Sequence, residues 1–219
     1  VLFADLDGTL IETASGKTFP EGIWDMKIKF DVLDAIKKLA PDCVFIVSNQ
    51  GGVEKGFVDE FSISCKSLYI SRVVKEYCNI GGAVRAKQCI SNNKTDKYRK
   101  PNTGMLESFF DEYMDKFNFD KGDALMIGDA SGKTGQFSDS DKKTAENFGI
   151  DYLDVEDFVS VMNATHASVK INKNTNESEN SQEDICLSPE TEMELVSSRE
   201  SKSGNSVSYT HLRAHETSQ

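Results

Sequence analysis

The sequence has 219 residues and a formal net charge of −11 at neutral pH, and 38% of its residues are hydrophobic. This length allows one domain of ordinary size, with or without an additional segment. The acidic balance argues against a protein that coats nucleic acid non-specifically, because neutralising many phosphates requires clustered basic side chains. The acidic charge is compatible with an enzyme that binds only the end of a nucleic-acid strand.

Cysteine content and hydropathy indicate the cellular compartment in which the protein is expected. The five cysteines, an odd number without a Cys-x-x-Cys pair, give neither a disulfide framework nor a zinc site. We therefore expect a reducing, intracellular compartment, either nuclear or cytoplasmic. No apolar run is long enough to span a bilayer, so no membrane association is predicted.

The composition divides the chain into three parts. Apolar runs of strand and helix length extend to Met162, which predicts a folded domain over residues 1–162. Residues 163–205 are rich in Asn, Ser, Glu and Lys, which predicts a disordered, acidic tail or linker that buries too little apolar surface to fold. Ser206 to Thr217 resembles a translated sequencing adapter, so residues 206–219 are excluded from fold reasoning. Val1 lies inside an apolar run, and we expect a few residues to precede it.

Within the first part, strand-like and helix-like patterns alternate. In chain order, the strand-like runs are Val1–Ala4, Cys43–Val47, Ala83–Ile90 and Ala124–Ile127, and helical spacing is found over Val32–Leu39, Leu68–Tyr77, Met105–Phe117 and Thr144–Phe148. Near-continuous apolar strands that alternate with helices predict a doubly wound, parallel α/β sheet covered on both faces. In such a fold, ligands bind beyond the carboxyl ends of the strands.

The first strand leads directly into Asp5-Leu6-Asp7-Gly8-Thr9. Two carboxylates separated by one residue repel each other unless a cation lies between them, and Mg²⁺ prefers carboxylate and phosphate oxygens. Gly8 allows a tight turn, and Thr9 offers a hydroxyl to the turn that follows. Taken alone, the motif is equally compatible with a calcium loop or a plain turn.

The second strand ends in Ser48-Asn49-Gln50, followed by two glycines. A hydroxyl and free backbone N–H groups at such a position can bind an anion. The same pattern is common in ordinary turns, so this motif is weak by itself.

Arg99-Lys100-Pro101 precedes the third helix. Proline near a helix start places Lys100 just outside the helix N-terminus, where the ammonium and the helix dipole both favour a phosphate. The alternative is a solvated basic pair on the surface.

The fourth strand ends at Asp129, which is placed like Asp5, and Ser138 to Asp141 precede the next helix. Asp129 thus completes an acidic cluster at the predicted strand edge. Ser138 or Asp139 is expected to cap that helix instead of serving the site.

The order of these four motifs resembles the haloacid dehalogenase-like superfamily throughout residues 1–162. This resemblance implies that Asp5 is the nucleophile that forms an aspartyl-phosphate, that Asp7 is the general acid and base, and that Ser48 and Lys100 bind phosphoryl oxygens. It also implies an Mg²⁺ ion held by Asp5, the Leu6 backbone carbonyl and Asp129, with Asp7 and Asp141 supporting the site. The inventory of side chains agrees, because residues 1–162 contain no histidine and a carboxylate must perform any acid–base step.

More specific stretches resemble the 3'-phosphatase domain of the polynucleotide kinase 3'-phosphatase family. These are Ser15 to Pro20, the sequence RKPNTGM, and GDASGK with its long insertion before Ser138. The short segment from Thr9 to Phe30 predicts a minimal cap and an open cleft. The resemblance implies a 3'-phosphorylated DNA or RNA end as substrate and leaves room for a kinase domain elsewhere in the gene. We expect substrate contacts from Thr9, Asn49, Gln50, Arg99 and Lys133, with Lys55, Lys142 and Lys143 near upstream phosphates.

Two alternatives stay open. One is a small-molecule phosphatase of the histidinol-phosphate or heptose-bisphosphate kind, since fold alone does not fix the substrate. The other is a catalytically silent interaction module whose tail recruits partners.

Overall fold

A computed structural model describes residues 1–17 and 20–165 of the chain. Most of the predicted tail over 163–205, and the whole of 206–219, lie outside the described residues. Within those that are described, no helix combines the length and the apolar character needed to cross a membrane.

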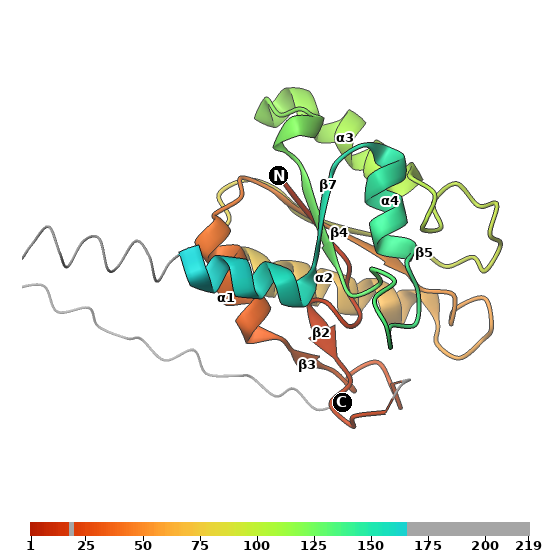
Figure 1. The fold of residues 1–219 in the computed structure, drawn as a ribbon. Helices are drawn as coiled ribbons and strands as arrows, with labels where there is room; N and C mark the ends of the chain where they lie inside the picture. Colours follow the sequence, from red (N-terminus) through yellow and green to blue (C-terminus); the bar gives the residue numbers. More distant parts are fainter. Residues whose placement is uncertain (18–19, 166–219) are drawn as a thin grey trace, which may run out of the picture. The chain divides into compact units, whose positions relative to one another are not determined.

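Five parallel strands form the central sheet (Figure 1), in the order β5-β4-β1-β6-β7. They are β1 (Leu2–Ala4), β4 (Val44–Asn49), β5 (Val84–Cys89), β6 (Leu125–Gly128) and β7 (Asp151–Asp154). The prediction of a parallel α/β sheet is confirmed. Because β4, β1 and β6 are adjacent and parallel, their carboxyl ends lie together at one edge of the sheet.

Helices cover both faces of this sheet. They are α1 (Phe30–Leu39), α2 (Glu60–Tyr77), α3 (Gly104–Phe117), α4 (Ser140–Phe148), a short 3₁₀ turn (Lys121–Asp123) and a helix over residues 155–165. Figure 1 shows α1 and α2 on one side of the sheet and α3 and α4 on the other. The fold is therefore doubly wound, as predicted.

Alternation of side chains along the strands explains the two layers, since successive residues point to opposite faces. Leu2 and Ala4 belong to the buried cluster that includes residues of α1, α2 and the helix over 155–165. Phe3 and Phe45 belong to the second cluster, with α3 and α4. The ring of Phe45 stacks on Phe109 of α3, with 4.6 Å between centroids. These two apolar layers fix the strand ends on which the site is built.

Between β1 and α1, the described residues form a hairpin of β2 (Ile11–Glu12) and β3 (Lys27–Ile28). Trp24 in this hairpin packs edge-on against Tyr69 of α2, with 5.9 Å between ring centroids. Between β4 and β5 the chain forms a loop and α2. The prediction of a minimal cap is thus confirmed.

Several elements differ from the sequence prediction, and α4 begins at Ser140, one turn before the predicted Thr144. Helix α2 begins at Glu60, two turns before Leu68, and β7 and the helix over 155–165 were not predicted as elements. Phe61 in the first turn of α2 is exposed. The apolar residues there therefore do not all lie on the buried face, and the spacing that would predict a helix is obscured. Strand β7 has only four residues and an Asp at each end, and it pairs with β6 on one side alone. Short edge strands of this kind carry little apolar pattern.

Candidate active site

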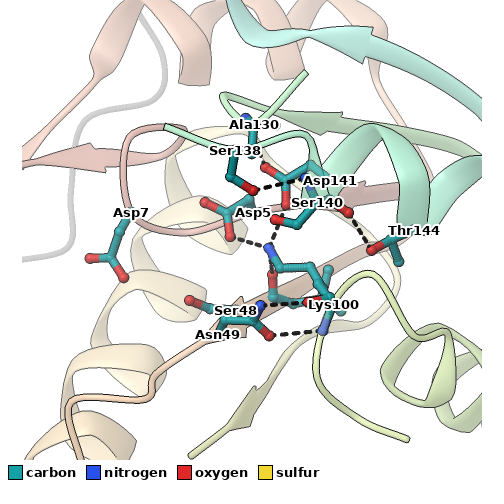
Figure 2. Close-up of polar contacts among 12 residues, drawn as sticks. Asp5, Asp7, Ser48, Asn49, Lys100, Ala130, Ser138, Ser140, Asp141 and Thr144 are labelled. Carbon is teal, nitrogen blue, oxygen red and sulfur yellow. Dashed lines mark hydrogen bonds and ion pairs between the residues drawn. The ribbon is translucent and has the colours of Figure 1, made fainter. Parts of the chain in front are cut away.

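Part of the predicted site lies where β1, β4 and β6 end, and Figure 2 shows Asp5, Ser48, Lys100 and Asp141 together there. Asp5 follows β1, Ser48 lies in β4, and Asp129 follows β6. Asp141 comes from the first turn of α4, and Lys100 comes from the loop before α3. Asp5, Ser48, Lys100 and Asp141 are all buried, so four segments far apart in sequence place polar side chains in one shielded position.

Lys100 is the cation at the centre of this arrangement. Its ammonium contacts Asp5 Oδ1, lies 2.7 Å from Asp141 Oδ1 and donates to the Val47 carbonyl at 2.9 Å. Burial lowers the pKa of Lys100, but the charges of Asp141 and Asp5 outweigh burial and raise it above its ordinary value. Burial raises the pKa of Asp5, and Lys100 offsets only part of that effect. Lys100 therefore stays positively charged beside the proposed nucleophile.

The Asn49 side chain holds the backbone of Lys100 in place. Its Oδ1 accepts from Lys100 N at 2.9 Å, and its Nδ2 donates to the Lys100 carbonyl at 3.0 Å. Asn49 was expected to contact substrate, and in this structure both ends of its amide are used to attach the Lys100 loop to β4. The precise placement of the ammonium therefore depends on Asn49.

Three carboxylates form a group that could hold a divalent cation. One oxygen each from Asp5, Asp129 and Asp141 lies within 4.8 Å of the others. Burial, followed by the charge of Asp141, raises the pKa of Asp129 to about 6. Lys100 pairs with Asp5 and Asp141, whereas no ion pair to Asp129 is found among the described residues, so its carboxylate is available to a cation. Hard oxygen ligands with uncompensated charge fit Mg²⁺.

Two glycines make room for these carboxylates. A Cβ on Gly8 would lie 2.1 Å from Asp129 Oδ2, and one on Gly128 would lie 2.3 Å from Asp141 Oδ2. Gly8 also has φ +88°, a conformation that other residues rarely adopt. Any residue other than glycine at these two positions would therefore displace Asp129 or Asp141.

The Leu6 carbonyl, the expected backbone ligand of the metal, accepts hydrogen bonds from Leu10 N at 2.9 Å and Ile11 N at 3.1 Å. Both of its lone pairs are thereby engaged in the turn that follows Asp5. The three-carboxylate group itself consists of side-chain oxygens.

Asp7 lies apart from the Asp5–Lys100–Asp141 group in Figure 2 and takes part in a second network. Its Oδ2 accepts from Gln50 Nε2 at 2.5 Å, and the same amide donates to Ser48 Oγ at 2.8 Å. Its Oδ1 accepts from Lys66 Nζ of α2 at 2.9 Å. The sequence analysis did not identify Lys66. Its one available signal is a lysine at helical spacing between the apolar residues Ile63 and Ile70.

The remaining residues that were predicted to contact substrate are Thr9, Arg99 and Lys133, and their surroundings differ. Thr9 is fully buried, and its hydroxyl has no hydrogen-bond partner among the described residues. Arg99 donates to the Ser91 carbonyl at 2.6 Å. Lys133 pairs with Asp154 at 3.2 Å and Asp157 at 2.8 Å. Their roles toward substrate stay predictions, and the ammonium of Lys133 already has two carboxylate partners.

The more distant lysines are exposed. Lys55 lies on the surface, Lys142 is 3.9 Å from Glu146, and Lys143 is 2.6 Å from Asp139. Ser138 Oγ accepts from Ser140 N at 2.9 Å at the start of α4, whereas Asp139 makes no capping hydrogen bond with its side chain. Of the two expected caps, Ser138 is therefore the one that accepts a backbone N–H.

Residues 1–159 match the family model described as polynucleotide kinase 3 phosphatase. The chain belongs to this family. It is 32% identical over 161 residues to a bifunctional polynucleotide phosphatase/kinase of Schizosaccharomyces pombe, covering 70% of this chain and 36% of that protein. It is 29% identical over 165 residues to an uncharacterized protein of Autographa californica nuclear polyhedrosis virus, covering 72% of this chain and 84% of that protein. The chain thus spans about a third of the yeast relative and most of the viral one.

Solved structures show the same fold at lower identity. A haloacid dehalogenase-like protein of Mesorhizobium loti matches with a TM-score of 0.52 and 18% identity, covering 75% of this chain and 84% of that one. A D,D-heptose 1,7-bisphosphate phosphatase from B. bronchiseptica, complexed with magnesium and phosphate, matches with a TM-score of 0.50 and 19% identity, covering 76% and 98%. The chain therefore has the haloacid dehalogenase-like phosphatase fold.

Proposed function

We propose that this domain removes the 3'-phosphate from a polynucleotide end, using Mg²⁺ and an aspartyl-phosphate on Asp5. The observation that carries the proposal is the meeting of Asp5, Lys100 and the acidic group at one strand edge, in a chain of the polynucleotide phosphatase family. Those side chains are the set that phosphoryl transfer needs, namely a nucleophile, a fixed cation and ligands for a metal.

In the first step, a carboxylate oxygen of Asp5 bonds to phosphorus while the bond from phosphorus to the 3' oxygen breaks. Asp7 donates a proton to that oxygen, which leaves as the 3'-hydroxyl. Lys100 and the Ser48 hydroxyl are the groups available to bind the phosphoryl oxygens. Lys100 is already held beside Asp5 by Asp141 and the Val47 carbonyl, so little reorganisation is required.

In the second step, Asp7 takes a proton from a water molecule whose oxygen bonds to phosphorus. The bond between phosphorus and Asp5 then breaks, which releases inorganic phosphate, restores the Asp5 carboxylate and leaves Asp7 protonated for the next turnover. Asp5, Asp129 and Asp141 are the residues that would hold Mg²⁺. When bound, Mg²⁺ would offset the negative charge that builds up on the phosphoryl oxygens.

A polynucleotide end suits this site because the cap is only a hairpin. The described residues include no inserted domain that would enclose a small metabolite. Relatives in Schizosaccharomyces pombe and in Acanthamoeba polyphaga mimivirus bear the name bifunctional polynucleotide phosphatase/kinase, the second as a tentative assignment. We extend the phosphatase part of that description to this chain, with a role in repairing nucleic-acid ends. A kinase domain elsewhere in the complete protein is part of the same proposal.

The test is a comparison of substrates with purified protein and Mg²⁺. Oligonucleotides with a 3'-phosphate should be hydrolysed far faster than the same oligonucleotides with a 5'-phosphate, histidinol phosphate or heptose bisphosphate. Asp5→Asn should be inactive on all of them because an amide is a poor nucleophile. Preference for a small substrate would contradict the proposal and favour a metabolite phosphatase.

A second control tests the alternative that the domain is a catalytically silent interaction module. A wild-type protein that hydrolyses neither the oligonucleotides nor an aryl phosphate with Mg²⁺ would show that the domain is silent. Intact Asp5, Lys100 and Asp129, brought together in the fold, favour activity.

A further inference from the structure

Lys66 is the one charged residue among those that α2 buries. It lies on α2 between Ile63 and Ile70, and all three residues are at most 5% exposed. Placing an ammonium in such a position costs free energy unless a negative partner accompanies it. The partner is Asp7, whose Oδ1 lies 2.9 Å from Lys66 Nζ. Because burying the Lys66 ammonium costs free energy and the ammonium contacts Asp7, we expect a role of Lys66 that acts on Asp7.

The two members of the pair differ in exposure. The Lys66 side chain is 6% exposed, whereas that of Asp7 is 49% exposed. A half-exposed aspartate that follows a buried strand would sample several rotamers in water. The ammonium of Lys66 is held by the helix and is the rigid partner, so the ion pair restricts Asp7.

Gln50 restricts the other carboxylate oxygen. Its Nε2 donates to Asp7 Oδ2 at 2.5 Å and to Ser48 Oγ at 2.8 Å. Gln50 is itself buried, and its backbone N donates to the Cys89 carbonyl of β5 at 2.7 Å. Both oxygens of Asp7 are therefore held by groups fixed to the sheet and to α2, and one of those groups also contacts a predicted phosphate-binding hydroxyl.

We infer that Lys66 is a positioning residue for Asp7, fixing the carboxylate that exchanges protons with the leaving oxygen and with water. The inference rests on the proposed function and adds a residue on α2 to it. Lys66 need not touch the substrate, because it acts through the orientation of Asp7. Orientation of a reacting group is worth a large rate factor, and a displacement of about 1 Å costs on the order of 100-fold.

The chemistry of the leaving group separates this role from a structural one. A 3' oxygen of a sugar is a poor leaving group and needs a proton as its bond to phosphorus breaks, whereas nitrophenolate leaves without one. In single-turnover measurements of leaving-group release, Lys66→Met should slow the oligonucleotide 3'-phosphate by about 10- to 100-fold. p-Nitrophenyl phosphate should be slowed by about threefold or less in the same variant. The Michaelis constants should change little.

The matched control is Arg72→Met, which removes an exposed cation from the same helix, where Glu76 is its one ion-pair partner among the described residues. It should behave like wild type on both substrates. Lys66→Arg should recover part of the oligonucleotide rate because it keeps the charge. If Lys66→Met reduces the thermal midpoint so far that the protein unfolds, Lys66→Arg and Lys66→Gln supply the same comparison of charge.

A double-mutant cycle is the decisive measurement. Asp7→Asn should be slow on the oligonucleotide, and adding Lys66→Met to it should cause no further loss, since the residue being positioned has lost its function. Losses that multiply, or equal slowing of both substrates, would overturn the positioning role and leave Lys66 as a structural ion pair. Wild-type rates in Lys66→Met would overturn it as well. A wild-type protein inactive on both substrates would instead refute the proposed function, and this inference with it.

Discussion

At the scale of single residues, two glycines leave the space that the carboxylates of the acidic group occupy. Asp141 is 1% exposed and reaches toward Asp5 over Gly128, and Asp129 lies against Gly8. At both positions a methyl group would overlap a carboxylate oxygen. The glycines therefore matter for the site as much as the carboxylates do.

We predict that Gly128→Ala weakens binding of Mg²⁺ by about tenfold or more, because the new Cβ would lie 2.3 Å from Asp141 Oδ2 and force that side chain aside. Isothermal titration calorimetry with Mg²⁺ or Mn²⁺ measures the effect. Gly81→Ala is the matched control, since nothing lies within 4 Å of a Cβ there and φ is not positive. Equal affinity in Gly128→Ala and wild type would place the cation elsewhere.

The protonation of Asp129 predicts how cation binding depends on pH. Burial and the charge of Asp141 raise its pKa to about 6, so the carboxyl is protonated below that pH and ionised above it. A divalent cation needs the ionised form. Mg²⁺ affinity should therefore be steady above about pH 7 and should fall by up to about tenfold per unit below about pH 6. Calorimetry between pH 5 and 8 tests this, and a flat profile would contradict it.

At the scale of elements, the loop from Asp129 to Asp139 is attached to the edge strand β7. Asp154 at the end of β7 is 3% exposed and accepts from Ser131 Oγ at 2.7 Å and Gln136 Nε2 at 2.6 Å. Lys133 adds an ion pair at 3.2 Å. The long loop before Ser138 is thus held in place by a strand that the sequence analysis missed.

Asp154→Ala should lower the free energy of unfolding by about 1–3 kcal/mol, because two partly buried donors, Ser131 Oγ and Gln136 Nε2, lose this acceptor. Chemical denaturation of the metal-free protein measures this effect. Asp157→Ala is the control, as its contact with Lys133 is an exposed ion pair that contributes about 0–1 kcal/mol. Similar stability in both variants would show that water replaces the Asp154 network.

At the scale of the whole molecule, the helix over residues 155–165 closes one face of the sheet with Val155 and Phe158, both almost fully buried. It continues beyond Met162, where the composition changes, and Asn163 Oδ1 accepts from Lys38 Nζ of α1 at 2.6 Å. We propose that the catalytic domain includes this helix at least to Thr165, three residues beyond the boundary that composition indicates.

Deleting residues 166–219 should therefore leave turnover unchanged and shift the thermal midpoint by no more than about 2 °C, since so polar a composition contributes little burial. Differential scanning calorimetry and oligonucleotide turnover are the measurements. Deletion from residue 155 onward is the contrasting variant, and it should destabilise the domain by several kcal/mol through the loss of Phe158. A large effect of the first deletion would show that the domain extends further.

Several features of the fold and site follow from sequence alone. Apolar runs alternating with helical spacing determine a parallel sheet, because only that fold buries such strands on both faces. Each motif follows a strand or precedes a helix, which is enough to predict that Asp5, Ser48, Lys100 and Asp129 meet at one edge. Each of these patterns lies within a short stretch of the chain, so it can be recognised in a single sequence.

Other features were decided only by tertiary contacts. The sequence shows Asn49 and Lys133 as polar residues near motifs, and only the fold shows that Asn49 holds the Lys100 backbone and that Lys133 pairs with Asp154 and Asp157. Lys66 is 59 residues from Asp7 in the chain, and no spacing rule links them. The physical reason is that a hydrogen bond depends on the separation of atoms in space, which the packing of α2 and β7 on the sheet determines and a sequence motif does not.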